Sequence, residues 1–210
     1  GVRGLRVARA NEALLTRQLD AIAKAASELG RTEETAPTWV MAPMVATARE
    51  AKWFAGLCAE RGLVAGAMIE VPAAALMADK IMPHLDFVSI GTNDLTQYTM
   101  AADRMSPQLA YLTDPWQPAV LRLIQHTCEE GKRTNTAVGV CGEAAADPLL
   151  ACVLAGLGVN SLSSASTAIA GVGAQLSAID FDTCVKAAEA AINAEGATEA
   201  RQKVRDILQP

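Results

Sequence analysis

The sequence predicts an α/β protein with a parallel sheet, built as the C-terminal part of a (β/α)₈ barrel. Short apolar segments alternate with amphipathic helical segments, which is typical of parallel strands joined by helices. No dinucleotide-binding glycine fingerprint follows any of these strands, which favours a barrel over a Rossmann sheet. A complete barrel has eight strands in about 250 residues. This chain of 210 residues offers five, or six if a short strand lies near Gly1.

The first half of the chain contains three predicted strands, each preceded or followed by a helix. Apolar residues recur at helical spacing from Asn11 to Leu29, and Gly30 provides a stop. Pro43 ends the first strand, and Pro72 suits the first turn of a helix. The predicted helices cover 11–29, 45–60 and 73–80, and the predicted strands cover 38–42, 63–69 and 87–90.

The second half repeats this alternation after one long irregular stretch. From Gly91 to Trp116 no period is visible, and a connection of this length is usually functional. The predicted helices then cover 117–130, 144–157, 167–176, 183–194 and 198–208, and the predicted strands cover 137–141 and 159–163. We expect a barrel portion over residues 1–176 and C-terminal helices over residues 177–210 that pack on it.

The composition excludes several classes of protein. A net charge of −5 without any basic run argues against nucleic-acid binding. No apolar segment approaches the length of a membrane span, and no signal peptide is visible. The five cysteines are scattered without a CxxC pair, which favours reduced thiols in the cytoplasm. The chain begins Gly1-Val2-Arg3 without Met, so we expect a fragment or processed piece of a longer protein.

Polar side chains follow the buried strand at 87–90 in quick succession. Gly91 lets the backbone turn, and Asn93 and Asp94 come directly after it. In a barrel this is the carboxyl end of a strand, where enzymes carry their catalytic residues. Thr, Asn and Asp are also good helix caps, so this stretch by itself leaves a helix cap and a functional site equally open.

Two carboxylates follow neighbouring predicted strands. The carboxyl ends of all barrel strands share one face, so Glu70 and Asp94 are expected to lie close together. Such a pair suits Mg²⁺, which takes one or two protein carboxylates and keeps water and substrate phosphate as its other ligands. The alternative for Glu70 is an interaction with a helix N-terminus, since Pro72 follows. Other residues at these strand ends are Met44, Cys141, Glu143 and Ser163.

Cys141 lies between two glycines at a strand end, where a thiol could exchange a proton with a carbon or enol centre. The alternative is a small buried apolar residue, which we expect for the other four cysteines. Three arginines are candidates to bind phosphate or carboxylate, namely Arg3, Arg6 and Arg104. His84 and His126 are expected to have a structural or solvent role.

Four segments occur in the order found in phosphoenolpyruvate-utilising enzymes. They are Met68–Ala74, Ser89–Tyr98, Asp103-Arg104 and Val140–Glu143. Together they most resemble enzyme I of the bacterial sugar phosphotransferase system (phosphoenolpyruvate–protein phosphotransferase), and Gly1–Arg6 resembles its arginine segment. The resemblance extends to about Ala170. Pyruvate phosphate dikinase and phosphoenolpyruvate synthase share the barrel and part of each motif, but the continuation Gln97–Arg104 favours enzyme I.

The resemblance implies a magnesium-dependent site. Glu70 and Asp94 would bind Mg²⁺. Cys141 would protonate the methylene carbon of the enolate as pyruvate forms. The metal and arginines would stabilise charge on the transferring phosphoryl group.

The resemblance also implies a substrate-binding set. Arg3, Asn93 and Arg104 would hold the phosphate and carboxylate of phosphoenolpyruvate. The sequence departs from the family pattern at two places. Val71 replaces the usual Thr, which alters a local hydrogen bond rather than the metal site. Met105–Pro107 replaces a common Gly-Asn or Met-Asn pair, so the shape of that loop is open.

The resemblance implies partners as well. Members of the family pass the phosphoryl group to a histidine on a separate N-terminal domain, which then phosphorylates the carrier HPr for sugar uptake. Neither His84 nor His126 lies in such a motif. We therefore expect weak phosphoenolpyruvate binding, no phosphotransfer by this piece alone, and a homodimer. The alternatives are a non-catalytic binding or dimerisation module, and a metal-dependent lyase or aldolase barrel acting on oxo acids.

Overall fold

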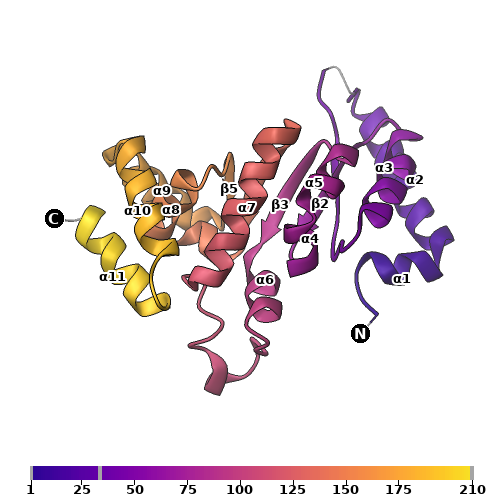
Figure 1. The fold of residues 1–210 in the computed structure, drawn as a ribbon. Helices are drawn as coiled ribbons and strands as arrows, with labels where there is room; N and C mark the ends of the chain where they lie inside the picture. The colour runs from indigo at the N-terminus through magenta and orange to yellow at the C-terminus, as the bar shows by residue number, and fades with distance from the viewer. Residues whose placement is uncertain (1, 33–34, 209–210) are drawn as a thin grey trace.

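A computed structural model describes residues 2–32 and 35–208. Five parallel strands form one sheet in the order β1-β2-β3-β4-β5, so neighbours in sequence are neighbours in space (Figure 1). The strands are β1 (Trp39–Ala42), β2 (Val64–Ile69), β3 (Phe87–Gly91), β4 (Ala137–Cys141) and β5 (Ser161–Ser163). The α/β class and the parallel sheet predicted from the sequence are confirmed.

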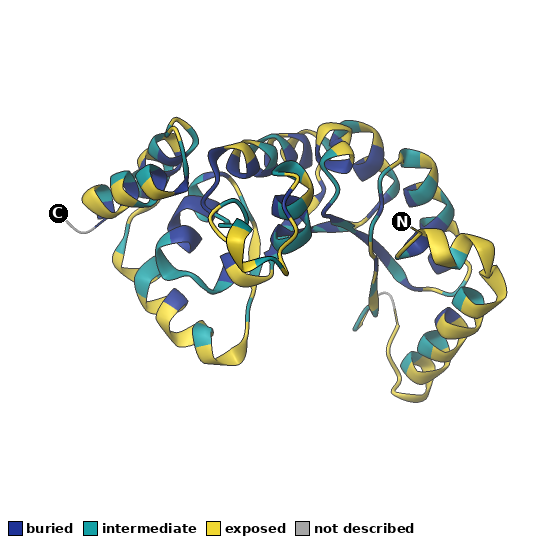
Figure 2. Ribbon diagram, turned by 90° about the horizontal axis from the view of Figure 1, so that it is seen from below, coloured by how far each residue is buried: buried dark blue, intermediate teal, exposed yellow. Residues whose placement is uncertain are grey.

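The helices and short 3₁₀ turns connect these strands. The α-helices are α1 (Leu5–Ala10), α2 (Glu12–Glu28), α3 (Ala48–Ala59), α4 (Pro72–Leu76), α5 (Ala78–Ile81), α6 (Thr92–Thr99), α7 (Pro118–Thr134), α8 (Pro148–Gly156), α9 (Ser166–Ala178), α10 (Phe181–Ile192) and α11 (Ala197–Leu208). The 3₁₀ turns are η1 (Met82–His84), η2 (Pro107–Leu109) and η3 (Glu143–Ala146). Figure 2 shows helices along the outer side of an arc, with strands beneath them.

The two faces of the sheet differ in burial. Ile69, Ile90 and Val140 are fully buried and belong to the core that the helices cover. The opposite face remains accessible, since Trp39 on this face is 58% exposed. Its ring lies beside that of Phe87, with the two ring centroids 4.6 Å apart. In a closed barrel this second face would line the interior. The sheet is therefore a barrel segment that lacks its remaining strands.

Three expectations near the N-terminus and the middle of the chain were wrong. Residues Leu5–Ala10 form helix α1 instead of a strand, with Leu5 buried on one side. The helix predicted over 73–80 is broken at Met77, which has φ −106° and ψ 24°. The stretch after Gly91 contains helix α6, which the sequence hides because it buries only Thr92, Leu95 and Thr96.

The helix predicted over 144–157 is also divided in two. Residues 143–146 form the turn η3, and α8 starts only at Pro148. The division arises because Asp147 caps α8, accepting hydrogen bonds from the N–H groups of Leu149 and Leu150. Proline at the first helical position then costs no hydrogen bond.

The C-terminal helices pack on α8 and on each other. A Cβ atom on Gly156 of α8 would lie 2.2 Å from the carbonyl oxygen of Cys184, so glycine is required where α8 meets α10. Arg122 of α7 donates from Nε to the carbonyl of Ile192 at the end of α10, at 3.0 Å. Helix α11 contacts both α10 and α8.

Within residues 2–32 and 35–208, we find no helix with the length and apolar character needed to cross a membrane.

Candidate active site at the carboxyl ends of the strands

The strand register places the ends of four strands in one row, with polar side chains at three of them. Ile69 of β2 is paired with Ile90 of β3, so Glu70 follows beside Gly91. Gly91 is paired with Cys141 of β4, and Cys141 with Ser163 of β5. Neighbouring strands lie about 4.8 Å apart. The backbones of Glu70 and Cys141 are therefore separated by about 10 Å, with Gly91 between them.

Gly91 is required in the middle of this row. A Cβ atom at this position would lie 2.6 Å from Oε2 of Glu70 and 2.7 Å from Cε of Met68. These contacts are too short to persist beside a Cβ atom, so a larger residue here would push the Glu70 carboxylate from its place over β3. The sequence indicated that Gly91 relaxes the backbone, but its main role is to leave space.

Glu70 is the most buried carboxylate of the site, with 5% of its surface exposed. Its Oε1 accepts a hydrogen bond from the backbone N–H of Met44 at 2.8 Å. Burial raises the pKa of Glu70 above its usual value, and the negative charge of Asp94 raises it further. The Met44 N–H and the charges of Arg104 and Arg3 act in the opposite direction.

Asp94 lies in the first turn of α6, where the helix dipole favours a negative charge. The N-cap of α6 is Gly91 and makes no side-chain cap hydrogen bond, so neither Asn93 nor Asp94 is the cap. The Asp94 carboxylate instead faces Arg104, with Oδ2 and Nη1 3.6 Å apart. The stretch does begin a helix, as the cap alternative requires, but no side chain of Thr92, Asn93 or Asp94 caps it.

The two carboxylates fit a magnesium ion by their chemistry. In the described residues, no three His, Cys, Asp or Glu side chains converge as a complete metal site. Mg²⁺ needs only one or two carboxylates when water and phosphate supply its remaining ligands. A cation beside Glu70 and Asp94 would also offset the repulsion and burial that raise the Glu70 pKa.

Asn93 contacts the turn that follows β4. Its Oδ1 accepts a hydrogen bond from the Glu143 N–H at 3.5 Å. Gly142 has φ 89°, and a Cβ atom there would lie 3.2 Å from Asn93 Oδ1. Thr92 donates from Oγ1 to the carbonyl of Cys141 at 3.0 Å. These contacts bind the start of α6 to the Cys141 strand end.

Cys141 differs from the other cysteines in exposure. It is partly exposed, and its Sγ lies 3.5 Å from the carbonyl oxygen of Ile90. The remaining four are buried: Cys58, Cys128, Cys152 and Cys184. Burial raises the pKa of Cys58 to about 11, that of Cys128 to about 12 and that of Cys152 to about 11. The expectation of buried, unreactive thiols is met by these residues, whereas Cys141 is accessible.

The candidate arginines have different partners. Arg3 donates to the hydroxyl of Tyr98, and the Arg104 N–H donates to Oε1 of Gln97 at 3.1 Å. Arg6 pairs instead with Glu50, with Nε and Oε1 3.7 Å apart.

A cavity of about 280 Å³ adjoins these side chains, lined by Arg3, Arg6, Met44, Val71, Pro72 and Tyr98. Tyr98 was not assigned a role from the sequence. It lies one helical turn after Asp94, so recognition of α6 would have placed it on the same face.

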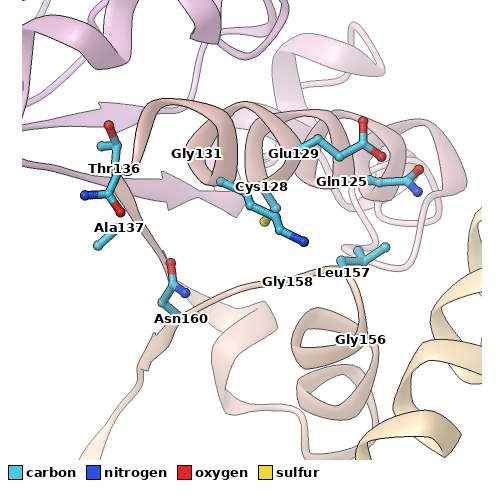
Figure 3. Close-up of a pocket in the computed structure, with 12 residues that line it drawn as sticks. Gln125, Cys128, Glu129, Gly131, Thr136, Ala137, Gly156, Leu157, Gly158 and Asn160 are labelled. Carbon is cyan, nitrogen blue, oxygen red and sulfur yellow. The ribbon is translucent and has the colours of Figure 1, made fainter.

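A larger cavity lies elsewhere and contains none of the predicted site residues. Its volume is about 750 Å³, and it lies between the C-terminal part of α7 and the turn that leads into β5. Figure 3 shows Cys128 and Glu129 on one side of it and Asn160 on the other. This is the amino end of the strands, the face that barrels use for stability rather than chemistry. His84 and His126 also lie outside the row, on η1 and α7.

Comparison with known proteins identifies one family. Residues 1–181 match the model of the PEP-utilising enzyme, PEP-binding domain. The chain is 49% identical over 210 residues to the phosphoenolpyruvate-protein phosphotransferase of Streptomyces coelicolor, covering 99% of this chain and 37% of that protein. It is 35% identical over 222 residues to the phosphoenolpyruvate-protein phosphotransferase of Latilactobacillus sakei, covering 99% and 38%. It is 43% identical over 203 residues to the multiphosphoryl transfer protein of Xanthomonas campestris, covering 96% and 24%.

A solved structure supports the fold. A citrate lyase from Burkholderia xenovorans is similar with a TM-score of 0.57 and 14% sequence identity, covering 92% of this chain and 67% of that one. At this identity the likeness concerns architecture alone, and it confirms the barrel-type fold that the sequence predicts. The chain spans less than two fifths of the length of the two phosphotransferases compared above.

Proposed function

Since the chain belongs to the PEP-utilising enzymes, we propose that it is the phosphoenolpyruvate-binding part of a phosphoenolpyruvate–protein phosphotransferase. The reaction would move the phosphoryl group of phosphoenolpyruvate to a histidine on another domain and release pyruvate. The observation that carries this proposal is the row at the strand ends. Glu70 and Cys141 flank Gly91, and the Asp94–Arg104 pair lies on the connection that follows β3.

The phosphate and carboxylate of the substrate would bind to Arg3, Asn93 and Arg104. Arg3 and Arg104 are exposed, so their guanidinium groups can reach a ligand above the row. Guanidinium groups bind phosphate and carboxylate oxygens in a forked geometry. Arg104 is only 3.6 Å from Asp94, so a phosphate that it binds would lie next to the candidate metal ligands.

Glu70 and Asp94 would hold Mg²⁺, which when bound would offset negative charge on the phosphoryl oxygens. Other residues of the chain place these two carboxylates. Gly91 leaves the space that the Glu70 carboxylate occupies, and the Met44 N–H fixes its orientation. The start of α6 holds Asp94 near the same strand end.

Cys141 would complete the reaction as a proton donor. The P–O bond breaks as the phosphoryl group passes to the histidine nitrogen, which leaves the enolate of pyruvate. The thiol proton then moves to the methylene carbon, and solvent returns a proton to sulfur. Cys141 suits this role because it is the accessible cysteine and lies about 10 Å across the sheet from Glu70.

The partners follow from the same proposal. The accepting histidine would belong to a domain outside this chain, with HPr as the next acceptor and sugar uptake as the process served. The names of the multiphosphoryl transfer relatives support linked phosphoryl carriers. We also propose Mg²⁺ dependence, a cytoplasmic location and a homodimer. We further propose that the chain alone binds phosphoenolpyruvate at best weakly and transfers nothing, and the exposed sheet face around Trp39 supports this.

The test is complementation. The part of the Streptomyces coelicolor relative that precedes the matched segment is added to this chain with phosphoenolpyruvate and Mg²⁺, and pyruvate release is followed. We expect release only with both parts, and its loss with Cys141→Ala or Asp94→Asn. Pyruvate release that needs no supplied histidine part would favour a lyase. If the two parts bind each other but release no pyruvate, the chain is a non-catalytic module. Sedimentation of the chain tests the dimer.

A further inference from the structure

The connection between α6 and α7 carries Arg104 and is fastened mainly at its two ends. Near its start, the Arg104 N–H donates to Gln97 Oε1 of α6 at 3.1 Å. The backbone then forms three linked turns, in which the N–H groups at 106, 109 and 112 bond to the carbonyls at 103, 106 and 109. Residues 105–110 make no side-chain hydrogen bond or ion pair to another element in the described structure. The position of these turns therefore depends on the ends.

The far end of this connection is held by Gln117 at the start of α7, whose Nε2 donates to the Tyr111 carbonyl at 2.9 Å, and by the C-terminal helix α11. Nη2 of Arg201 lies 3.2 Å from Oδ1 and 3.3 Å from Oδ2 of Asp114. The same guanidinium lies over the ring of Trp116, 5.4 Å from its centroid. Asp114 also accepts from the Trp116 N–H at 3.0 Å. One arginine thus engages both neighbours of Pro115.

Trp116 links this contact to helix α8. Trp116 is fully buried, and its Nε1 donates to Oδ2 of Asp147 at 2.9 Å. Asp147 is the N-cap of α8, so the indole is fixed to a core helix. Within residues 2–32 and 35–208, the buried Nε of Arg201 has no hydrogen-bond partner, which costs free energy. The arginine head is therefore placed by Asp114 and Trp116 although its Nε stays unsatisfied.

We propose that Arg201 is a positioning residue for the phosphoenolpyruvate site. By holding Asp114 and Trp116, it fixes the far end of the linked turns and, through them, the place of Arg104. The part of this inference that concerns substrate rests on the proposed function. The part that concerns Arg104 does not, because the position of its backbone can be measured without any ligand.

The test uses the 210-residue chain with Arg201→Leu, Asp114→Asn and both together. Amide hydrogen exchange is read residue by residue by NMR. Loss of a charge-assisted hydrogen bond should speed exchange of residues 103–113, including the Arg104 amide, by about tenfold while strands β2–β4 stay protected. The double variant should exchange no faster than Arg201→Leu, because that change already removes the contact with Asp114. Arg201→Lys should restore part of the slow amide exchange, since lysine keeps the positive charge but lacks the forked donor geometry of a guanidinium.

The matched control is Arg205→Leu, which removes an exposed arginine one turn further along the same helix and should change nothing. In a titration with phosphoenolpyruvate and Mg²⁺, Arg201→Leu should weaken binding by about threefold to tenfold, and Arg205→Leu should not. Unchanged exchange at Arg104, an equal rise across the whole sheet, or faster loop exchange with unaltered affinity would each overturn the inference. If phosphoenolpyruvate binds neither to the unsubstituted chain nor to the chain with the complementing part added, the proposed function fails, and the Arg104 amide alone decides the positioning role.

Discussion

Replacement of Glu70 by Gln should stabilise the chain without Mg²⁺ and abolish its response to Mg²⁺. Glutamine keeps the Oε1 acceptor that the Met44 N–H uses at 2.8 Å, and it removes a charge from a side chain that is 5% exposed. It also ends the repulsion from Asp94. Substitutions that relieve such strain at functional sites commonly gain about 1 kcal/mol. In a chain of this length, that gain raises Tm by about 2–4 °C.

The assay is thermal unfolding at pH 7 with and without Mg²⁺. At ten times its Kd, Mg²⁺ should stabilise the unsubstituted chain by about 1.4 kcal/mol, because it binds the folded state alone. Glu70→Gln should show the higher Tm in chelator and no rise with Mg²⁺. The control Glu189→Gln, at an exposed position on α10, should leave both values unchanged. A lower Tm in chelator, or a retained Mg²⁺ response, would contradict the assigned burial and metal roles of Glu70.

The pH dependence of the same experiment has a definite sign. The pKa of Glu70 is higher in the folded chain than in the unfolded chain, chiefly through burial. Below the unfolded value both states are protonated, and the group has no effect. As pH rises from the unfolded to the folded pKa, the folded state loses stability, because the unfolded state releases its proton to water while the folded state still keeps its own. The advantage of Glu70→Gln in chelator should therefore grow through this interval and stay constant above it.

Three further outcomes are expected. Gly91→Ala should lower the free energy of unfolding by about 2 kcal/mol and remove the Mg²⁺ response in thermal unfolding, because the new methyl group would occupy the space of the Glu70 carboxylate. A normal Mg²⁺ response would show that the carboxylate can move away. Iodoacetamide should label Cys141 first, as judged by mass spectrometry against Cys141→Ser, and equal labelling of the buried cysteines would contradict their burial. The emission of Trp39, 58% exposed, should shift to shorter wavelength when the complementing N-terminal part is added, and an unchanged spectrum would indicate that this face stays open.

The central strands could be predicted from the sequence because their apolar runs are continuous. The strand over 137–141 matches β4 residue for residue, and that over 87–90 differs from β3 by one position. Helix α6 could not be recognised in this way, since polar side chains dominate it and tertiary contacts stabilise it. The start of α3 was placed too early, although Thr47 and Glu50 form a capping box that the sequence displays.

In the candidate site too, some features follow from a local sequence pattern and others depend on tertiary contacts. The closeness of Glu70 and Asp94 follows from two adjacent strands with matching ends, so a sequence pattern can reveal it. The Met44–Glu70 hydrogen bond and the contact of Arg3 with Tyr98 depend on loop conformation and on an unrecognised helix. Arg201 lies furthest from any such pattern, because its role arises from a helix that packs 87 residues away in sequence from Asp114.

The row of site residues explains how part of a barrel can keep the centre of an active site. Glu70 directly follows β2, while Gly91 and Cys141 end β3 and β4, and each of these strands has a paired neighbour on both sides. The strand ends that carry Glu70 and Cys141 are therefore held by hydrogen bonds and core packing that need no barrel closure. In the described sheet, the unpaired edges are those of β1 and β5. Strands added at those edges would cover the exposed face around Trp39 and bring further side chains to the rim, while the central row kept its present geometry.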